Sequence, residues 1–463
     1  MTFLRSHSSS LASVLIAAFC AVPSPAQKPL PSAPSAQLLA QATPAPAGMQ
    51  PAAQPGSNPK LTLTDAERIA LEHNPNISVA HLLQLAQAQV TREVRAGELP
   101  FAVADLTAVG AHDNSRLTAG ALNNPIVYDR AAGGLTVRQL ITDFGRTHNL
   151  IRSAQSNAKA QLETERATAE EITLAVDQAF YQTLTAEAVL KVAQQTVATR
   201  QTTAEQITAL TQSKLRSTLD LSLAQVQVSQ AQLLVLDAQD AEQTAMAALN
   251  ALLGSSGNQQ YNLVDETSAN PQLAPESTED MVQVALRSRP DLAALGDRAL
   301  AAKQFASAEH DLMRPTISAL VTIGGTPVRA DQIQSSWYGA AGANVSIPVF
   351  NGFAYSARAK EAGLRAKAAT EQVRNLQDNI ARDVRTAVLN AQRAFDRIGV
   401  SKQLLDQSNT AMELAQARYK VGLSGIVDLT QAQLAQTEAL IGYTNARYAY
   451  QTALAEVRFQ TGQ

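Results

Sequence analysis

The stretch YKVGLSGIVDLTQAQ, residues 419–433, decides the fold of this chain because it interrupts a long helical pattern. No proline occurs after Pro348, and segments rich in Ala, Gln and charged residues flank the stretch on both sides. Gly422 suits the left-handed position that ends an incoming helix, and Ser424 can cap an outgoing one. The stretch therefore predicts the turn of a very long helical hairpin.

The chain contains this stretch twice. An earlier copy, SKLRSTLDLSLAQ at residues 213–225, matches it when Asp220 is laid on Asp428, an offset of 208 residues. The same offset lays Gly254 on Gly462. A period near 200 residues is far too long for a solenoid repeat, so the sequence predicts two similar halves of one fold.

Composition argues for thin layers of helices rather than a thick core. Aromatic residues make up only 4% of the chain, and Ala and Gln recur throughout the helical segments. Small side chains let helices approach each other closely. The net charge is −3, with 37 basic and 40 acidic residues, so nothing in the charge favours nucleic acid as a partner.

The N-terminus has the pattern of an export signal. Arg5 precedes an apolar run at 11–22 and a small-x-small site, so residues 1–26 are interpreted as a signal peptide. The alternative, a membrane anchor, is disfavoured because the run is too short to cross about 30 Å of hydrocarbon. Cys20 is the only cysteine, and Phe19 stands where a lipoprotein signal needs a small residue, so lipidation is also disfavoured.

Residues 27–60 are rich in Pro, Ala, Gln and Ser with hardly any charge, which predicts a disordered leader. We expect a first repeat at 61–270 and a second at 271–463.

Each half opens with a helix that a proline interrupts. Thr64 followed by Glu67 predicts a capping box for the first helix, and Ser277 with Asp280 starts the second. The prolines that interrupt these helices are Pro75 and Pro290, and those after which the sequence period changes are Pro100 and Pro315.

Alternating sequence follows in both halves. Residues 316–323 and 337–347 place apolar side chains on one face and polar ones on the other, which predicts a β-hairpin. The first half has a weaker counterpart at 101–110 and 135–141, joined by a polar loop, and Asp105 interrupts its apolar face.

Very long helices come next. Neither Gly nor Pro occurs between Gly145 and Gly254, and a turn near Arg216 leaves an incoming helix of roughly 65 residues, about 100 Å long. The second half repeats this helix at 353–421.

Four strands with one apolar face, together with an export signal, indicate outer-membrane β-structure that one chain cannot close into a barrel. The chain must therefore oligomerise, with each copy contributing four strands. Trp337 and Tyr338, at the end of a predicted strand, fit an aromatic membrane interface, and a solvent-exposed loop is the alternative.

From residue 61 to 462 the chain resembles the TolC-like outer-membrane efflux protein family. Each motif alone is weak, and their order, spacing and duplication make the match specific, although the two copies differ by short insertions. They are Asn74-Pro75, QLITDFG at 139–145, Arg289-Pro290-Asp291-Leu292, SIPVFNG at 346–352, Ala417-Arg418-Tyr419 with Gly422, and the terminal segment 453–462.

The resemblance implies a mainly α-helical homotrimer with a shared 12-stranded β-barrel in the outer membrane and a helical tunnel in the periplasm. It implies an exit duct for an efflux or type I secretion system, with a periplasmic adaptor protein, an inner-membrane transporter and outer-membrane lipid as partners. The alternatives are a periplasmic adaptor, which would show a Gly-rich β module, and a coiled-coil tether, which would show sustained heptads.

The resemblance also assigns residues to the adaptor contact. Val421, Gly422 and Leu423 match the turn that forms part of this contact in the family. In the first half only Leu215 is kept, and Lys214 replaces the glycine, which we expect to change the turn geometry.

A closed pore is implied at the same end. Asp428 matches an aperture carboxylate, and Tyr419 with Asp220 match a latch pair on different hairpins. The family's second acidic ring falls on Gln431 and its latch arginine on Ser424, so we expect a less negative constriction and a looser latch. The alternative is that Asp220 and Asp428 only favour the positive ends of their helices.

No catalytic, cofactor or metal site is predicted. The six histidines do not cluster at metal-ligand spacing, and the sequence lacks phosphate-binding and nucleophile motifs. The sequence therefore predicts that the protein is not an enzyme.

Overall fold

The structure, a computed structural model, describes residues 59–110, 116–119, 122–126, 130–255, 257, 259–266, 277–328 and 335–462, with only strand positions given between 116 and 130. These residues belong to one compact unit, Asn58–Gln463. The predicted signal peptide and all but the end of the predicted leader lie outside the described residues. None of the described helices has an apolar stretch of the length that a membrane crossing requires.

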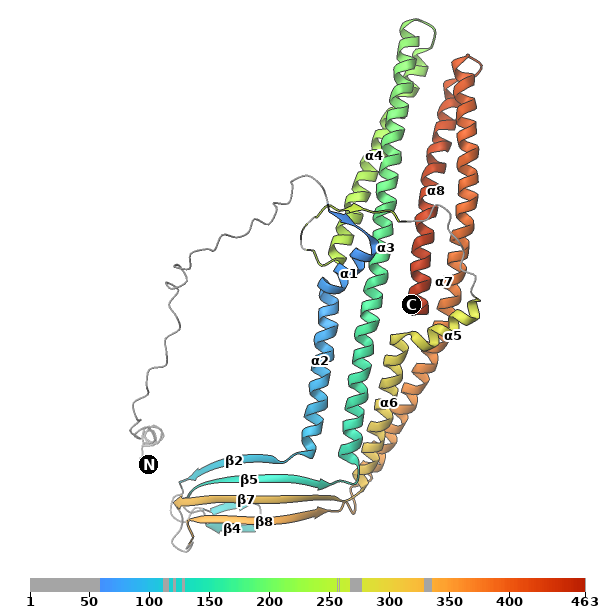
Figure 1. The fold of residues 1–463 in the computed structure, drawn as a ribbon. Coiled ribbons are helices and arrows are strands. Elements are labelled where there is room, and N and C mark those ends of the chain that lie inside the picture. Colours follow the sequence, from blue (N-terminus) through green and yellow to red (C-terminus); the bar gives the residue numbers. More distant parts are fainter. Residues whose placement is uncertain are drawn as a thin grey trace, which may run out of the picture. The chain divides into compact units, whose positions relative to one another are not determined.

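The two halves contain the same succession of helices (Figure 1). Helices of 11 and 21 residues precede the strands, and helices of 67 and then 35 or 36 residues follow them. The first half has α1 (Leu63–His73), α2 (Pro75–Arg95), α3 (Arg146–Gln212) and α4 (Thr218–Leu252), and the second has α5 (Thr278–Ser288), α6 (Pro290–His310), α7 (Ala354–Lys420) and α8 (Ile426–Thr461). The two-fold repeat is confirmed, and its boundaries at 61–270 and 271–463 stay a prediction.

The first helix begins earlier than the sequence pattern indicated. Thr62, not Thr64, is the N-cap of α1, and its hydroxyl accepts from the backbone N–H of Asp65 at 3.2 Å. The reason is that Leu61 is buried in β1 (Lys60–Leu61), which pairs in parallel with β6 (Asn262–Leu263) and fixes where the helix starts. Ser277 caps α5 as predicted.

Pro75 and Pro290 each stand at the first position of a new helix, where a missing N–H costs nothing. Asn74 caps α2 through its side-chain oxygen, and its amide nitrogen donates to the carbonyl of Leu252 at 2.9 Å. The break between α1 and α2 is thus tied to the end of α4. Single 3-10 turns, η2 (Ala96–Glu98) and η3 (Asp311–Met313), lead from α2 and α6 to the strands.

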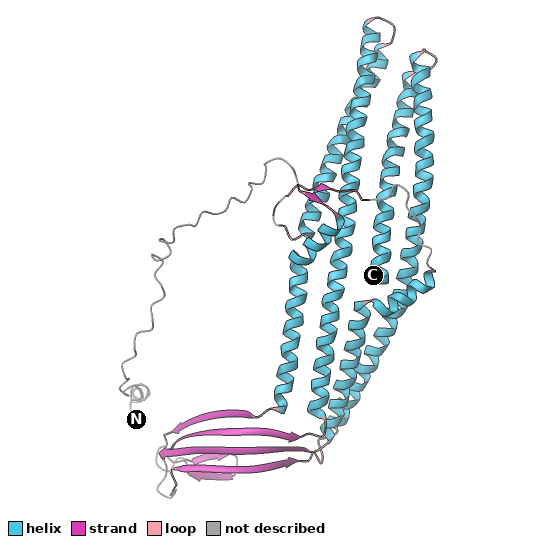
Figure 2. Ribbon diagram, viewed as in Figure 1, coloured by secondary structure: helices cyan, strands magenta, loops and turns pink. Residues whose placement is uncertain are grey.

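Four strands form one antiparallel sheet (Figure 2). Its order is β2 (Phe101–Val109), β5 (Arg130–Thr142), β7 (Thr316–Val328) and β8 (Trp337–Ser346). The predicted hairpin of the second half is confirmed. In the first half β5 begins at Arg130 rather than at 135, because its backbone pairing with β2 continues through Gly133 and Gly134. The loop between them carries a small hairpin, β3 (Arg116–Ala119) and β4 (Leu122–Ile126).

The sheet has one apolar and one more polar face. Paired positions share a face, so Val137, Val321 and Ala341 lie on the apolar side, and Thr136 and Thr322 lie on the other. Asp105 pairs with Gly134, which lies two residues before Thr136 along β5, so Asp105 is on the polar face with Thr136 and on the opposite face from Leu135. Our expectation that Asp105 interrupts the apolar face is therefore wrong. The apolar face of β2 instead consists of Ala102, Ala104, Leu106 and Ala108.

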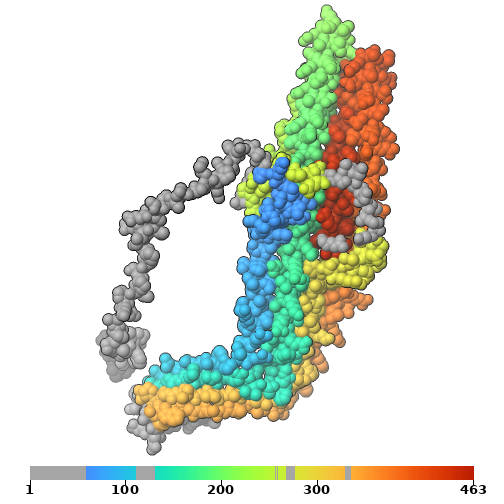
Figure 3. Space-filling view, viewed as in Figure 1, coloured from blue at the N-terminus to red at the C-terminus, as the bar shows by residue number. Residues whose placement is uncertain are grey.

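Helices pack in a layer in which α2, α3, α6 and α7 lie side by side (Figure 3). The two longest helices, at 67 residues each, are about 100 Å long. The side of α4 that packs toward α3 buries an alanine every seventh residue: Ala224, Ala231, Ala238 and Ala245. Small side chains at this seam let the helices lie close together and explain why few aromatic residues suffice.

Two short helices cover the same layer. Ala66 and Ala70 of α1 pack with Ile172 and Phe180 of α3. Met281, Val282 and Ala285 of α5 pack with Ile380 and Val384 of α7. The largest apolar clusters thus lie midway along the long helices rather than at their ends.

Candidate gate at the tips of the helical hairpins

The hairpin turns at 213–217 and 421–425 have the same backbone structure. Each places one residue in the left-handed region, Lys214 with φ +58° and Gly422 with φ +77°. The same two backbone hydrogen bonds close each helix end. They join Leu215 to Leu210 (2.8 Å) and Lys214 to Thr211 (3.0 Å), and Leu423 to Arg418 (2.9 Å) and Gly422 to Tyr419 (3.1 Å).

Two expectations about these turns are therefore wrong. Lys214 does not change the turn geometry, because it adopts the left-handed conformation that glycine adopts in the second copy. Ser424 does not cap α8, because the N-cap residue is Gly425, and the hydroxyl of Ser424 is buried without a hydrogen-bond partner among the described residues. In the first half Ser217 does cap α4, accepting from Leu219 at 3.1 Å.

Arg216 joins the two hairpins. Its guanidinium lies 4.4 Å from the ring centre of Tyr419 and donates to the carbonyl oxygen of Tyr419 at 2.8 Å. One residue thus contacts both the π face and the backbone end of α7. The predicted sites did not include Arg216. The internal repeat contained the signal, because Arg216 occupies the first-half position equivalent to Ser424, where the resemblance placed the latch arginine.

The predicted latch pair, Tyr419 and Asp220, lies close enough for an electrostatic effect, but these two described side chains form no hydrogen bond with each other. Tyr419 is 6% exposed, and its hydroxyl has no hydrogen-bond partner among the described residues. Burial raises the pKa of Tyr419, the charge of Arg216 opposes this shift, and the nearby carboxylate of Asp220 adds to it. Asp220 therefore acts on Tyr419 through space, while Arg216 makes the direct contacts.

An apolar cluster supports this contact from below. Tyr419 packs with Ile207 of the first hairpin and with Met412, Ile426 and Leu429 of the second. Ile207 is 1% exposed and Leu429 is 2% exposed, so the two hairpins share a closed core near their tips. Tyr419 and Arg216 also line a small cavity of about 110 Å³ between the hairpins.

The predicted aperture residues lie on the outside of this cluster. Asp428 is in the first turn of α8, and Gln431 follows three residues later on the same helix face. Both are exposed in the single chain. Their side chains are therefore free to face other copies or a pore.

Exposed apolar side chains lie at the tips of both hairpins. Leu215, Val421 and Leu423 are 71%, 69% and 72% exposed. Leu215 and Leu423 occupy equivalent turn positions. A Cβ atom added to Gly422 would have no neighbouring atom within 4 Å among the described residues. Both hairpins thus present the same kind of surface, although only one retains the glycine.

The two aromatic residues proposed for the membrane interface lie on opposite faces of β8. Trp337 is 66% exposed and shares the apolar face with Gly339. Tyr338 covers Gly134 and Gly324 on the polar face, where a Cβ atom on either glycine would overlap its ring. The alternation of a strand dictates this separation.

Two known bacterial proteins are similar to this chain in sequence. The outer membrane protein TolC of Salmonella enteritidis is 26% identical over 121 residues, which are 26% of this chain and 25% of TolC, so this match spans about a quarter of that relative. The alkaline protease secretion protein AprF of Pseudomonas aeruginosa is 22% identical over 412 residues, 87% of this chain and 84% of AprF.

Solved structures show the same fold. CusC, described for its transmembrane channel formation, superposes with a TM-score of 0.76 at 20% identity, covering 86% of this chain and 92% of that one. The outer-membrane channel OprN superposes with a TM-score of 0.75 at 18% identity, covering 86% and 89%.

The sequence profile described as "Outer membrane efflux protein" matches residues 68–255 and 281–463. The two matched segments fall in the two halves and together span most of the chain. The chain therefore belongs to the outer membrane efflux protein family.

Proposed function

We propose that three copies of this chain form the outer-membrane exit duct of an efflux or type I secretion system. The observation that carries this proposal is the four-stranded sheet, whose edge strands β2 and β8 have no partner among the described residues. A sheet with an apolar face and open edges is stable in a membrane only when its edges are paired. Three copies supply twelve strands, enough to close a barrel.

The long helices α3 and α7 set the length of the duct. Helices of about 100 Å continue from the strands and end at the hairpin tips, so the tips lie far from the membrane. In this proposal the tips close the periplasmic end of the tunnel, with three Asp428 side chains around the axis and Gln431 behind them. The repulsion between these carboxylates would be offset by bound cations.

Arg216 and Tyr419 form the latch in this proposal, with Asp220 beside them. Opening the tunnel requires the two hairpins to separate, and this contact joins them. The family's arginine position on the second hairpin is occupied by Ser424, and Arg216 on the first hairpin takes over its role.

The exposed turn residues Val421, Gly422, Leu423 and Leu215 form the contact for a periplasmic adaptor, which connects the duct to an inner-membrane transporter. AprF, which matches most of this chain, is named as a protein secretion component, and this supports type I secretion as one use of the duct. Trp337 lies at the membrane interface on the apolar face, and Tyr338 faces the barrel interior.

Deletion and complementation test the proposal. A strain lacking this protein should become sensitive to compounds that its system exports or should retain a secreted protein, and the intact gene should restore export. Normal export in the deletion strain, with no second member of the family present, would contradict the proposed function.

A further inference from the structure

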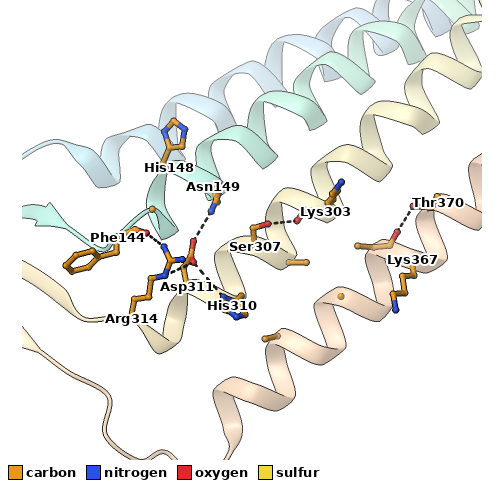
Figure 4. A pocket seen from close by; sticks show the side chains of 15 residues that line it. Phe144, His148, Asn149, Lys303, Ser307, His310, Asp311, Arg314, Lys367 and Thr370 are labelled. Atoms are coloured by element: carbon orange, nitrogen blue, oxygen red, sulfur yellow. Dashed lines mark hydrogen bonds and ion pairs between the residues drawn. The ribbon is translucent and has the colours of Figure 1, made fainter.

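A cavity of about 760 Å³ lies where the helices meet the sheet (Figure 4). The gate is at the opposite end of the helices (Figure 1). It is lined by the first turn of α3, the end of α6 and the beginning of α7. Phe144 at its border follows the end of β5 by two residues, and Arg314 precedes the start of β7 by two. The cavity is therefore adjacent to the membrane-spanning sheet.

Cationic side chains outnumber carboxylates in the lining of this cavity. Lys303, Arg314 and Lys367 line it together with one carboxylate, Asp311. Among the described residues, neither lysine has a carboxylate within 4.0 Å. His148 and His310 also line the wall. The cavity thus has an excess of positive charge and two ammonium groups that no ion pair occupies.

The single carboxylate is already engaged. Asp311 is 6% exposed, accepts from the side-chain amide of Asn149 at 2.8 Å, and lies 3.3 Å from Nε of Arg314. Arg314 in turn donates to the carbonyl oxygen of Phe144 at 2.6 Å. These contacts hold the floor of the cavity in place and leave Lys303 and Lys367 for a ligand.

The cavity opens on one face of α7. Nearer the middle of α7, helix α5 packs on this same face. Its lining residues Gly363, Ala366 and Thr370 each lie 18 residues, five helical turns, before a residue that packs in the cluster of α5. Those residues are Ala381, Val384 and Val388. A bulky helix such as α5 must lie outside an open tunnel, so this face is the outer one in the proposed trimer.

A second cavity meets the cationic one at Asp311 and Arg314, which line both. It is also lined by Leu140, Thr316 and Ser346, whose pairing places them on the more polar face of the sheet. The cationic cavity instead includes Phe144, which is 46% exposed and follows Ile141, 59% exposed. Apolar surface therefore borders the cationic cavity directly.

We propose that the cavity binds the phosphate of a phospholipid headgroup from the inner leaflet of the outer membrane. Lys303 and Lys367 pair with the phosphate, and the acyl chains lie against Phe144 and the apolar face of the sheet. This inference rests on the proposed function, because the trimer defines which face is outer. Basic pockets beside membrane-spanning elements are a known way to hold anionic lipid heads.

Native mass spectrometry of the full-length trimer, delipidated and titrated with phosphatidylglycerol, tests this site. We expect each trimer to retain up to three phosphatidylglycerol molecules. Lys303→Gln with Lys367→Gln should weaken their binding about 25-fold, about fivefold for each lysine. The charge-preserving pair Lys303→Arg with Lys367→Arg should retain the lipid, which keeps the test valid where the glutamine pair does not assemble.

The control pair is Lys159→Gln with Lys360→Gln, which removes the same charge from exposed positions on α3 and α7 that do not line the cavity. It should bind phosphatidylglycerol as the unmodified protein does. Equal loss in both glutamine pairs, or no lipid on an intact trimer, would overturn the inference while the trimer mass in the same spectrum still supports the proposed function.

Inorganic phosphate distinguishes a lipid from a soluble anion. For a lipid headgroup site, millimolar phosphate should leave the bound phosphatidylglycerol in place, because the acyl chains contribute to binding. Complete displacement by inorganic phosphate would show a site for free anions and would overturn the assignment to lipid.

Discussion

The guanidinium of Arg216 lies 4.4 Å from the ring centre of Tyr419, and it donates to the same residue's carbonyl oxygen at 2.8 Å. Arg216 is in the turn of the first hairpin, and Tyr419 is in the last turn of α7 in the second. A part-buried cation–π contact and a charged hydrogen bond together contribute about 2 to 4 kcal/mol. This relationship is the most direct link between the tips of the hairpins.

Removing this link should make the closed channel leak. Arg216→Gln loses both contacts and leaves the apolar cluster beneath them, so the hairpins should separate more often. In planar bilayers we expect more frequent and longer openings than in the unmodified trimer. Arg418→Gln, a change of the same kind in the last turn of α7, serves as the control, and equal openings in the two variants would contradict the latch role.

Asp428 should govern block by divalent cations. If three Asp428 carboxylates surround the axis, divalent cations added from the periplasmic side should block conductance strongly, and Asp428→Asn should weaken the block by about tenfold or more. Strong block that the substitution leaves unchanged would remove Asp428 from the constriction.

Gln431 provides the complementary change. Gln431→Asp should tighten the same block, because it adds a second ring of carboxylates one helical turn along α8. Unchanged block in this variant would show that this face of α8 does not line the pore.

We expect Leu423 to contribute to binding a partner and not to the folding stability of the chain. Its side chain is 72% exposed, so Leu423→Ala should change the free energy of unfolding by less than about 0.5 kcal/mol. Export should nevertheless fall several-fold if an adaptor docks there, as measured by accumulation of an exported dye. Leu364→Ala is the control, an exposed leucine (66%) near the other end of α7, and it should leave export unchanged.

Gly422→Ala complements this test. Lys214 shows that a non-glycine residue can adopt the turn, at a cost of about 1 to 2 kcal/mol, and a Cβ at Gly422 meets nothing within 4 Å. The variant should therefore assemble. Normal export by this variant would remove Gly422 from the adaptor contact.

Stability should depend on pH through Asp177. This side chain is 4% exposed, and burial, followed by the nearby Glu67, raises its pKa to about 7. Between its unfolded pKa near 3.9 and pH 7 the folded chain keeps a proton that the unfolded chain loses, so stability falls as the pH rises through this range. Thermal unfolding should occur at a lower temperature at about pH 8 than at about pH 5.

Asp177→Asn should flatten this dependence without abolishing it, because burial and then Glu242 also raise the pKa of Glu187 to about 7. The exposed Asp237→Asn is the control and should leave the difference between the two pH values unchanged. An Asp177→Asn profile identical to that of the unmodified protein would contradict the assignment.

The sequence predicted most of the fold because backbone chemistry controls it locally. Pro75 and Pro290 begin helices, the absence of Gly and Pro keeps α3 continuous, and Gly422 marks the turn between α7 and α8. The errors arose where tertiary contacts decide. Burial of Leu61 moved the first cap to Thr62, and pairing with β2 extended β5 back to Arg130.

The candidate site was predictable only in part. The positions of Tyr419, Asp220 and Asp428 followed from matching motifs, but Arg216 reaches Tyr419 across 203 residues of sequence, and no local pattern reveals such a contact. Lys214 was misjudged for a related reason, since the hydrogen bonds at the end of α3 hold it in a conformation that its own preferences disfavour.

The mass of the protein extracted from the outer-membrane fraction in detergent tests the central claim most directly. Light scattering, corrected for the bound detergent, should give the mass of three chains, because three sheets of four strands pair every open edge in the proposed twelve-stranded barrel. A monodisperse particle with the mass of one chain would contradict the shared barrel and, with it, the proposed duct.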